Sequence, residues 1–224
     1  PFWLKAFRLT RRTLELSAAA RRSLARRAMD CCWKRTATEP EATAPSATSA
    51  PYPIKAVCEV AAEGKSCSGE TGATGVTGTI TFEQVDADNC KISYEIKGLA
   101  PGKHGFHVHE KADFSNGCNS AGPHYNPHKK LHGAPEDEER HVGDLGNIEP
   151  GEDGVAKGEI VDRLIKLEGE FTVIGRSMMV HADPDDLGLG DNSEPGPPPV
   201  NGKASKATGN AGARLACGEI KASA

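Results

Sequence analysis

The chain has 224 residues, which is enough for one large domain or two small ones. Only 37% of the residues are hydrophobic and 5% aromatic, and no run of 18 apolar residues occurs, so the sequence predicts no membrane-spanning helix. Residues 1–28 hold eight of the 27 Lys and Arg but one of the 31 Asp and Glu, which leaves 19 basic and 30 acidic residues for the remainder. Such an acidic body disfavours binding to nucleic acid and to anionic membranes.

The first 53 residues predict no folded structure. Residues 1–28 are rich in Arg, Ala and Leu, a composition typical of a transit peptide; sequence upstream of a translation start at Met29 and a basic surface-binding arm are the alternatives. Residues 36–53 are rich in Pro, Ala, Thr and Ser and predict a flexible linker. We therefore expect the folded domain at residues 54–224. A start at Met29 favours the cytoplasm, whereas a genuine transit peptide favours a chloroplast or mitochondrion.

Residues 54–224 predict a β protein. Apolar and polar residues alternate at 75–84, and similar runs lie at 54–60 and 90–97. Eight short strands and no convincing helix indicate an antiparallel all-β sandwich or barrel. Two long stretches predict loops, and long loops in compact domains are usually functional: 110–142 and 182–212. The remaining strands are expected at 106–109, 143–148, 155–162, 171–180 and 213–221.

Seven of the eight histidines lie between positions 104 and 144. His107 and His109 are two residues apart, so on a strand their side chains leave the same face while Val108 points to the core. Three histidines and a carboxylate in or beside the first loop suit tetrahedral zinc, and four imidazole nitrogens, completed by His181, suit Cu(II). The alternative, scattered loop histidines without a common role, is disfavoured by this concentration. The donors of the zinc set are His124, His132, His141 and Asp144.

Five motifs resemble, in order, those of the copper,zinc superoxide dismutase family. They are GFHVH (105–109), GCNSAGPHYNP (117–127), EERHVGDLGN (138–147), GRSMMVH (175–181) and GNAGARLACG (209–218). The resemblance extends from Lys55 to Ile220, and the spacings of eight, nine and three residues from His124 to Asp144 also match. It implies an eight-stranded antiparallel Greek-key β-barrel or sandwich, immunoglobulin-like, with two long functional loops. The implied reaction is disproportionation of two superoxide anions to O2 and H2O2 by copper that cycles between Cu(II) and Cu(I).

The resemblance also implies the cofactors, a copper ion and a zinc ion, and their ligands. His124 would hold both metals as a bridging imidazolate and carry a proton during turnover, while zinc holds this ring in place. The implied copper ligands are His107, His109, His124 and His181. The implied zinc ligands are His124, His132, His141 and Asp144.

Three further roles follow from the resemblance. Asp185 matches an aspartate that links His107 to His132 through their free N–H groups, as outer partners of metal ligands do. Arg214 matches an arginine that receives the anion beside copper, where its permanent charge favours binding. Thr208 matches a threonine that narrows the substrate channel opposite the arginine.

Cys118 and Cys217 match the internal disulfide of the family, which joins the first long loop to the last strand. His104 matches a structural histidine, and His128 matches no functional position. Two lysines of the second loop are hypothesised to add to the positive field near Arg214: Lys203 and Lys206.

The chain departs from the family pattern in several places. The second loop carries an insertion near residues 193–206, whose role the sequence does not define. Glu59, Lys111 and Glu219 stand where dimeric members place small or apolar interface residues, and burial of unpaired charge costs several kcal/mol. The resemblance implies a homodimer, but these charges either pair across an interface or indicate a monomer or weak dimer.

Seven cysteines are too few for a disulfide scaffold, and their number is odd, so at least one is free. Cys58 is predicted to be a buried free thiol on a strand. A bridge between Cys67 and Cys90 is an open alternative to two more free thiols.

Two other functions remain open to such a sequence. One is the copper chaperone of this enzyme, which shares a similar domain but carries CxxC and CxC motifs that this sequence lacks. The other is metal storage without turnover, which requires no anion guide such as Arg214. For the enzyme, the resemblance implies a copper chaperone as a partner during maturation and superoxide as substrate.

Overall fold

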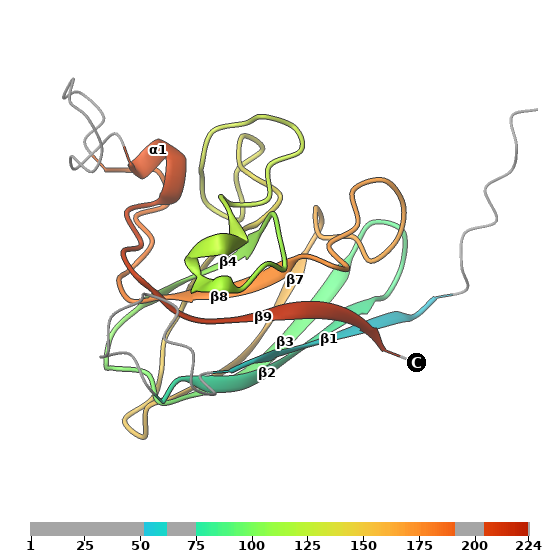
Figure 1. The fold of residues 1–224 in the computed structure, drawn as a ribbon. Coiled ribbons are helices and arrows are strands. Elements are labelled where there is room, and N and C mark those ends of the chain that lie inside the picture. The colour runs from blue at the N-terminus through green and yellow to red at the C-terminus, as the bar shows by residue number, and fades with distance from the viewer. Residues whose placement is uncertain (1–51, 62–74, 191–203, 224) are drawn as a thin grey trace, which may run out of the picture. The chain divides into compact units, whose positions relative to one another are not determined.

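The computed structural model describes residues 52–61, 75–190 and 204–223 (Figure 1). Within them lie nine strands and two short helices. The strands are β1 Ile54–Val60, β2 Thr77–Gln84, β3 Cys90–Lys97, β4 His104–His109, β5 Ser115–Cys118, β6 Asp144–Ile148, β7 Val155–Asp162, β8 Ser177–His181 and β9 Arg214–Ser223. The helices are the 3₁₀ turn η1 Asn119–Ala121 and the single α-helical turn α1 Ser205–Thr208.

Eight of these strands form one sheet in the order β6-β4-β8-β9-β1-β2-β3-β7. All of its pairs are antiparallel, and the sheet curves into a nearly closed barrel (Figure 1). Neighbours that are distant in sequence, such as β4 with β8 and β9 with β1, give the Greek-key connectivity. The predicted all-β antiparallel architecture is therefore confirmed.

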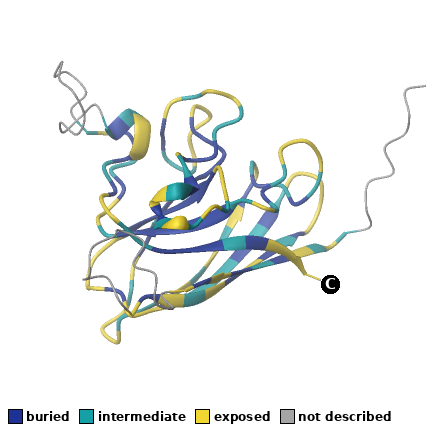
Figure 2. Ribbon diagram, in the orientation of Figure 1, coloured by how far each residue is buried: buried dark blue, intermediate teal, exposed yellow. Residues whose placement is uncertain are grey.

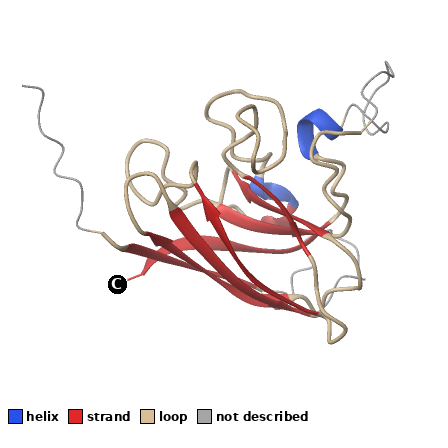
Figure 3. Ribbon diagram, turned by 180° about the vertical axis from the view of Figure 1, so that it is seen from behind, coloured by secondary structure: helices blue, strands red, loops and turns tan. Residues whose placement is uncertain are grey.

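The barrel is held together by side chains that alternate between its two faces. In β2, Ile80 and Phe82 are buried while Thr79 and Thr81 are exposed, as the period of two predicts. Buried and exposed positions form bands along the strands (Figure 2). Full burial of such an apolar side chain contributes roughly 1.5–3 kcal/mol. The strands support the loops, which extend from the strand ends (Figure 3).

Three predictions about the elements need correction. The strand expected at 171–180 begins only at Ser177, because a turn with positive φ at Gly169 and Gly175 occupies the preceding residues. The first long loop contains β5 and η1, and the second contains α1, although no helix was expected. All three elements are too short to leave a periodic signal in the sequence.

The cysteine predictions are partly confirmed. Cys58 is a buried free thiol, as expected, and Cys90 is another. Because Cys90 points into the core from β3 and is free, the alternative bridge to Cys67 is not formed. Cys67, Lys203, residues 1–51 and most of the insertion near 193–206 lie outside the described residues. No helix of the described part is long and apolar enough to cross a membrane.

Candidate metal centre

Strand β4, the second strand in the sheet order, presents two of the histidines. His107 and His109 are fully buried on one face, and Val108 packs into the hydrophobic core on the other. β4 lies between β6 and β8, so both flanks are hydrogen-bonded and the two rings are held on rigid backbone. The alternation predicted for these three residues is confirmed.

The first long loop returns to β4 and brings His124 beside it. Residues His109 and His124 form an antiparallel bridge. The amide of Tyr125 donates to the Val108 carbonyl (2.8 Å), and the amide of Val108 donates to the Gly143 carbonyl (2.9 Å). A Cβ at Gly143 would lie 2.2 Å from the Val108 oxygen, so only glycine allows this approach. These hydrogen bonds hold the loop against β4 beside His124.

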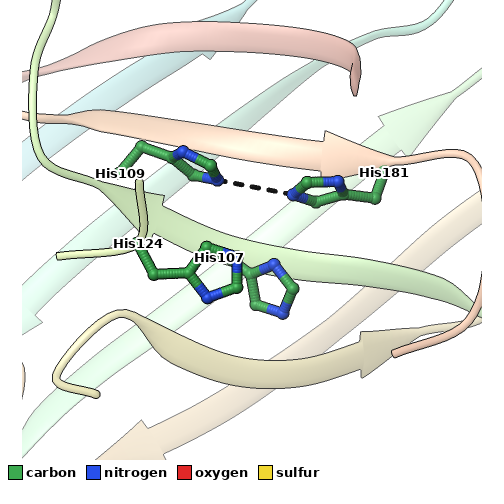
Figure 4. A group of neighbouring side chains, drawn as sticks. All are labelled: His107, His109, His124 and His181. Atoms are coloured by element: carbon green, nitrogen blue, oxygen red, sulfur yellow. Dashed lines mark hydrogen bonds between the residues drawn. The ribbon is translucent and has the colours of Figure 1, made fainter. Parts of the chain in front are cut away.

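The structure brings four buried histidines into a first cluster (Figure 4): His107, His109, His124 and His181. His109 Nδ1–H donates to the Gly122 carbonyl (2.8 Å), and His181 Nδ1–H donates to the Gly212 carbonyl (3.3 Å). A carbonyl only accepts, so these partners assign the proton to Nδ1 in both rings. Both Nε2 atoms then carry lone pairs, and they face each other at 3.4 Å. A cation between the two Nε2 atoms would accept both lone pairs.

The second cluster surrounds one carboxylate oxygen, Oδ1 of Asp144. The Nδ1 atoms of His124, His132 and His141 lie 2.8, 3.0 and 3.1 Å from it. Oδ2 of the same carboxylate accepts from the backbone amides of His141 (2.8 Å) and Gly133 (3.3 Å), which fixes its orientation. Three imidazole nitrogens and a carboxylate thus converge within the reach of one ion. His124 belongs to both clusters.

Asp185 connects the two clusters. Its Oδ2 accepts from His107 Nε2–H (2.8 Å), and its Oδ1 accepts from His132 Nε2–H (2.8 Å). The other ring nitrogen of His107, Nδ1, is buried and makes no hydrogen bond with the described residues, while Nδ1 of His132 lies 3.0 Å from Asp144 Oδ1. Asn147 holds the Asp185 backbone through two hydrogen bonds of 2.8 Å. The arrangement leaves the Nδ1 lone pair of His107 available to a cation and points Nδ1 of His132 into the second cluster.

The electrostatic surroundings keep the first cluster neutral. Burial, followed by the neighbouring His124, lowers the pKa of His107 and His109 well below the ordinary value. Burial and the neighbouring His107 do the same to the pKa of His181. These rings therefore carry no proton at the lone pair at neutral pH and can bind a cation.

The second cluster behaves differently because it contains a carboxylate. Burial alone would lower the pKa of His132, but hydrogen bonds to Asp144 and Asp185 raise it to about 9. Burial likewise opposes ionisation of Asp144, yet hydrogen bonds from the three histidines outweigh it and lower the pKa of this carboxyl. The carboxylate is therefore charged at neutral pH, and a metal that binds here must displace a proton from the cluster.

The comparisons agree with this geometry. The profile of the family described as copper/zinc superoxide dismutase (SODC) matches residues 76–220. A superoxide dismutase (Cu-Zn) of Candida glabrata is 55% identical over 151 residues, which is 66% of this chain and 92% of that protein. This chain belongs to the copper/zinc superoxide dismutase family.

The disulfide expected for a family member is present. Cys118, at the end of β5, is bonded to Cys217 in β9, with the Cα atoms 5.8 Å apart. The bridge joins the first long loop to the barrel, and it lies beside Met179 and Ala121 in a small buried cluster. The prediction of this pairing is confirmed.

Arg214, the first residue of β9, also contacts the first long loop. Its Nη1 donates to the carbonyl of Cys118 (2.7 Å) and its Nη2 to the carbonyl of Gly122 (2.7 Å). The Gly122 carbonyl also accepts from His109, so the guanidinium and a ring of the first cluster share one acceptor. Thr208 ends α1, where its hydroxyl donates to the Ala204 carbonyl (3.0 Å).

A groove of about 660 Å³ opens beside the two clusters. Its lining includes His124 and His141, the Arg176–Tyr125 pair, in which the guanidinium lies 3.5 Å from the ring centroid, and Lys206. Arg214 and Thr208 do not line it. Lys203 and Lys206 were hypothesised to add to the positive field near Arg214. Of the two, Lys206 lines this groove together with His124 and His141.

Three residues escaped the sequence analysis: Asn147, Gly209 and Arg140. Asn147 and Arg140 stand within the EERHVGDLGN motif, and Gly209 begins GNAGARLACG. The motifs mark these positions, but their hydrogen bonds and close contacts depend on backbone far away in the sequence. His128, the one histidine without an expected role, meets Phe171 edge to face with 4.7 Å between ring centroids and belongs to neither cluster.

Proposed function

We propose that the chain disproportionates two superoxide anions to O2 and H2O2, with copper in the first cluster and zinc in the second. The observation that carries the proposal is the position of His124, whose ring belongs to both clusters. Its Nδ1 faces Asp144 and the second cluster, so its Nε2 is left for the first. One imidazole can therefore hold a cation at each nitrogen.

The residues fit these metals. Four imidazole nitrogens suit Cu(II), and three imidazoles with a carboxylate suit zinc. The buried Nδ1 atom of His107 lacks a hydrogen-bond partner among the described residues, which would be costly unless it ligates a cation. The proposed copper ligands are His107, His109, His124 and His181. The proposed zinc ligands are His124, His132, His141 and Asp144.

The side chains supply binding, orientation and protons. When bound, copper supplies one-electron redox chemistry and zinc a fixed positive charge. One electron and two protons must be accounted for: one superoxide loses an electron, and the other gains that electron and takes up two protons. Nε2 of His124 is the atom proposed to hold and deliver one of these protons, because Nδ1 stays committed to the second cluster. Asp185 would keep His107 and His132 oriented throughout.

Arg214 is proposed to receive the anion. Three backbone carbonyls, those of Cys118, Asn119 and Gly122, hold its guanidinium, which leaves the Nε–H and one Nη2–H for a small anion. Thr208 is proposed to border the same channel. In an otherwise acidic body, such a local positive charge steers an anion and makes its association sensitive to salt.

Pulse radiolysis of the full chain loaded with copper and zinc tests the proposal. We expect superoxide decay with a second-order rate constant on the order of 10⁸–10⁹ M⁻¹s⁻¹, falling as salt is added. His124→Ala should abolish this decay, whereas the matched loop variant His128→Ala should retain it. Complete metal loading of the unmodified chain without decay above that of buffer would contradict the proposed reaction.

The assembly is a separate part of the proposal. The register that pairs Cys58 with Ile220 places Glu59 beside Glu219 on neighbouring strands. Glu219 has Lys221 as its ion-pair partner at 3.5 Å, within its own strand. A two-fold contact over this face would bring four carboxylates together, and each charge buried without a partner costs several kcal/mol.

We therefore propose a monomer or a weak dimer rather than the tight homodimer that the family resemblance implies. Sedimentation velocity of the full chain and of a Glu59→Val, Glu219→Val variant tests this. The variant should self-associate more tightly. A tight dimer of the unmodified chain would contradict it.

The remaining proposals concern the cell. A copper chaperone is the proposed source of copper during maturation, and nucleic acid and membranes are not proposed as partners, given the acidic body. The proposed location is the cytoplasm, with a chloroplast or a mitochondrion as the alternative if residues 1–28 act as a transit peptide. Imaging of the full chain and of a chain without residues 1–28, each fused to a fluorescent protein, separates these locations.

A further inference from the structure

Arg140 is the largest fully buried side chain of the described residues. It precedes His141 directly, yet its own side chain is only 1% exposed and touches neither cluster's converging nitrogens. Burial of a guanidinium is strongly unfavourable unless its N–H groups are paired. Packing alone therefore does not explain why Arg140 is buried, and its hydrogen bonds indicate a role.

The guanidinium binds the backbone between two proposed zinc ligands. Its Nη1 donates to the carbonyl oxygens of His141 (3.2 Å), Val142 (3.5 Å) and Asp144 (3.1 Å). These are three of the four carbonyls in the segment that runs from one ligand to the other. The guanidinium therefore holds the segment that sets the separation of the His141 ring from the Asp144 carboxylate.

The opposite side of the guanidinium is anchored in the barrel. Nη2 donates to Oδ2 of Asp162, the last residue of β7. Oδ1 of Asp162 accepts from the amides of Leu164 (2.7 Å) and Ile165 (2.9 Å), so the carboxylate is itself fixed. A continuous path of hydrogen bonds thus leads from β7 through Arg140 to the ligand segment.

We propose that Arg140 is a positioning residue for zinc. It fixes the backbone from His141 to Asp144 so that the imidazole and the carboxylate keep the separation that a tetrahedral ion needs. The inference rests on the proposed zinc set. Outer groups that orient metal ligands typically change metal affinity by 10–100-fold when removed, and Arg140 is expected to fall in this range.

Arg140→Lys tests the role. Lysine keeps the positive charge next to Asp162, but a single ammonium cannot also serve the row of carbonyls as the planar guanidinium does. The matched control is Arg163→Lys. Arg163 also donates to a carbonyl of the first long loop, that of Asp137 (3.2 Å), but from an exposed position away from the ligands.

Two readouts separate positioning from a merely structural role. Zinc affinity, measured by competition with a chromophoric chelator, should fall 10–100-fold in Arg140→Lys and remain unchanged in Arg163→Lys. The visible absorption bands of Co²⁺ bound in place of zinc should shift in Arg140→Lys alone, because they report ligand geometry. Copper affinity should stay the same in both variants.

A second variant covers the case in which Arg140→Lys does not fold. Arg140→Met combined with Asp162→Asn removes both charges, so neither is left buried without its partner. Its zinc affinity and Co²⁺ bands should change in the same way. A folded variant of either kind with unaltered zinc affinity and Co²⁺ bands overturns the positioning role. Failure of the unmodified chain to bind zinc would instead overturn the zinc assignment, and this inference with it.

Discussion

Gly209→Ala tests whether the buried hydrogen bonds around Asp185 set zinc affinity. Gly209 ends α1 in the left-handed conformation, with φ at +66°. A Cβ at this position would lie 1.9 Å from Asp185 Oδ1 and 2.5 Å from His132 Nε2. The carboxylate cannot retreat freely, because the same Oδ1 accepts from the amide of Leu187 (2.8 Å) as well as from His132.

Two effects of this substitution can be estimated from the structure. A residue with a side chain in the left-handed region costs about 1–2 kcal/mol of stability. In addition, real Cβ atoms do not approach within 3.0 Å of other atoms, so the carboxylate oxygen must move by about 1 Å. This displacement breaks or stretches its hydrogen bond to His132, and such an outer-partner loss lowers metal affinity about 10–100-fold, or roughly 1.4–2.8 kcal/mol.

The control is Gly169→Ala. Gly169 has φ at +79°, but an added Cβ would meet nothing within 4 Å. It therefore carries the backbone strain without the clash. Thermal unfolding of the metal-free proteins should show a loss in both variants, larger in Gly209→Ala because of the clash, while zinc competition should show weaker binding in Gly209→Ala alone. Unchanged zinc affinity in Gly209→Ala, or an equal loss in both variants, would refute the reasoning.

Three further predictions concern activity, stability and thiol chemistry. Arg214→Gln should lower the rate constant about tenfold and flatten its salt dependence in pulse radiolysis, because the steering charge is lost; an unaltered salt dependence would contradict this. Cys118→Ser with Cys217→Ser should lower the free energy of unfolding by about 2–5 kcal/mol in urea, because a cross-link over 99 residues is opened, and an unchanged midpoint would contradict it. Burial raises the pKa of Cys58 and Cys90 to about 12, so their thiolates form only as the pH approaches that value, and neither should be alkylated in the native protein at pH 8. Site-resolved mass spectrometry checks this, and prompt labelling of either thiol would count against it.

Most of the candidate metal centre could be predicted because its possible donors follow local rules. The period of two along β4 places His107 and His109 on one face whatever the rest of the fold does. The other donors are marked by residue type and spacing within motifs. What the sequence alone could not supply is the assignment of ring nitrogens. It depends on carbonyls such as that of Gly122, which the loop brings to His109 only once the chain is folded.

The missed and corrected features share a dependence on distant contacts. Arginine is a residue type that usually lies at the surface, and Arg140 can be buried because Asp162 of β7 pairs with its guanidinium. α1 contains a single turn, which is far too short to be stable alone. Its position depends on contacts outside the helix: Ser205 donates to Asp186 (2.8 Å), and the Lys206 carbonyl accepts from the His132 amide (2.9 Å). Such elements arise from tertiary structure rather than local pattern.

The candidate metal centre and the stability of the barrel are coupled. The Nδ1 atom of His107 is buried without a hydrogen-bond partner among the described residues, and such a group costs about 1–3 kcal/mol. The Nε2 lone pairs of His109 and His181, 3.4 Å apart, add mutual repulsion. The same three atoms become favourable once they ligate a cation. Because a ligand that binds only the folded state stabilises it, these three atoms, which weaken the metal-free protein, are the ones through which bound metal would strengthen the fold.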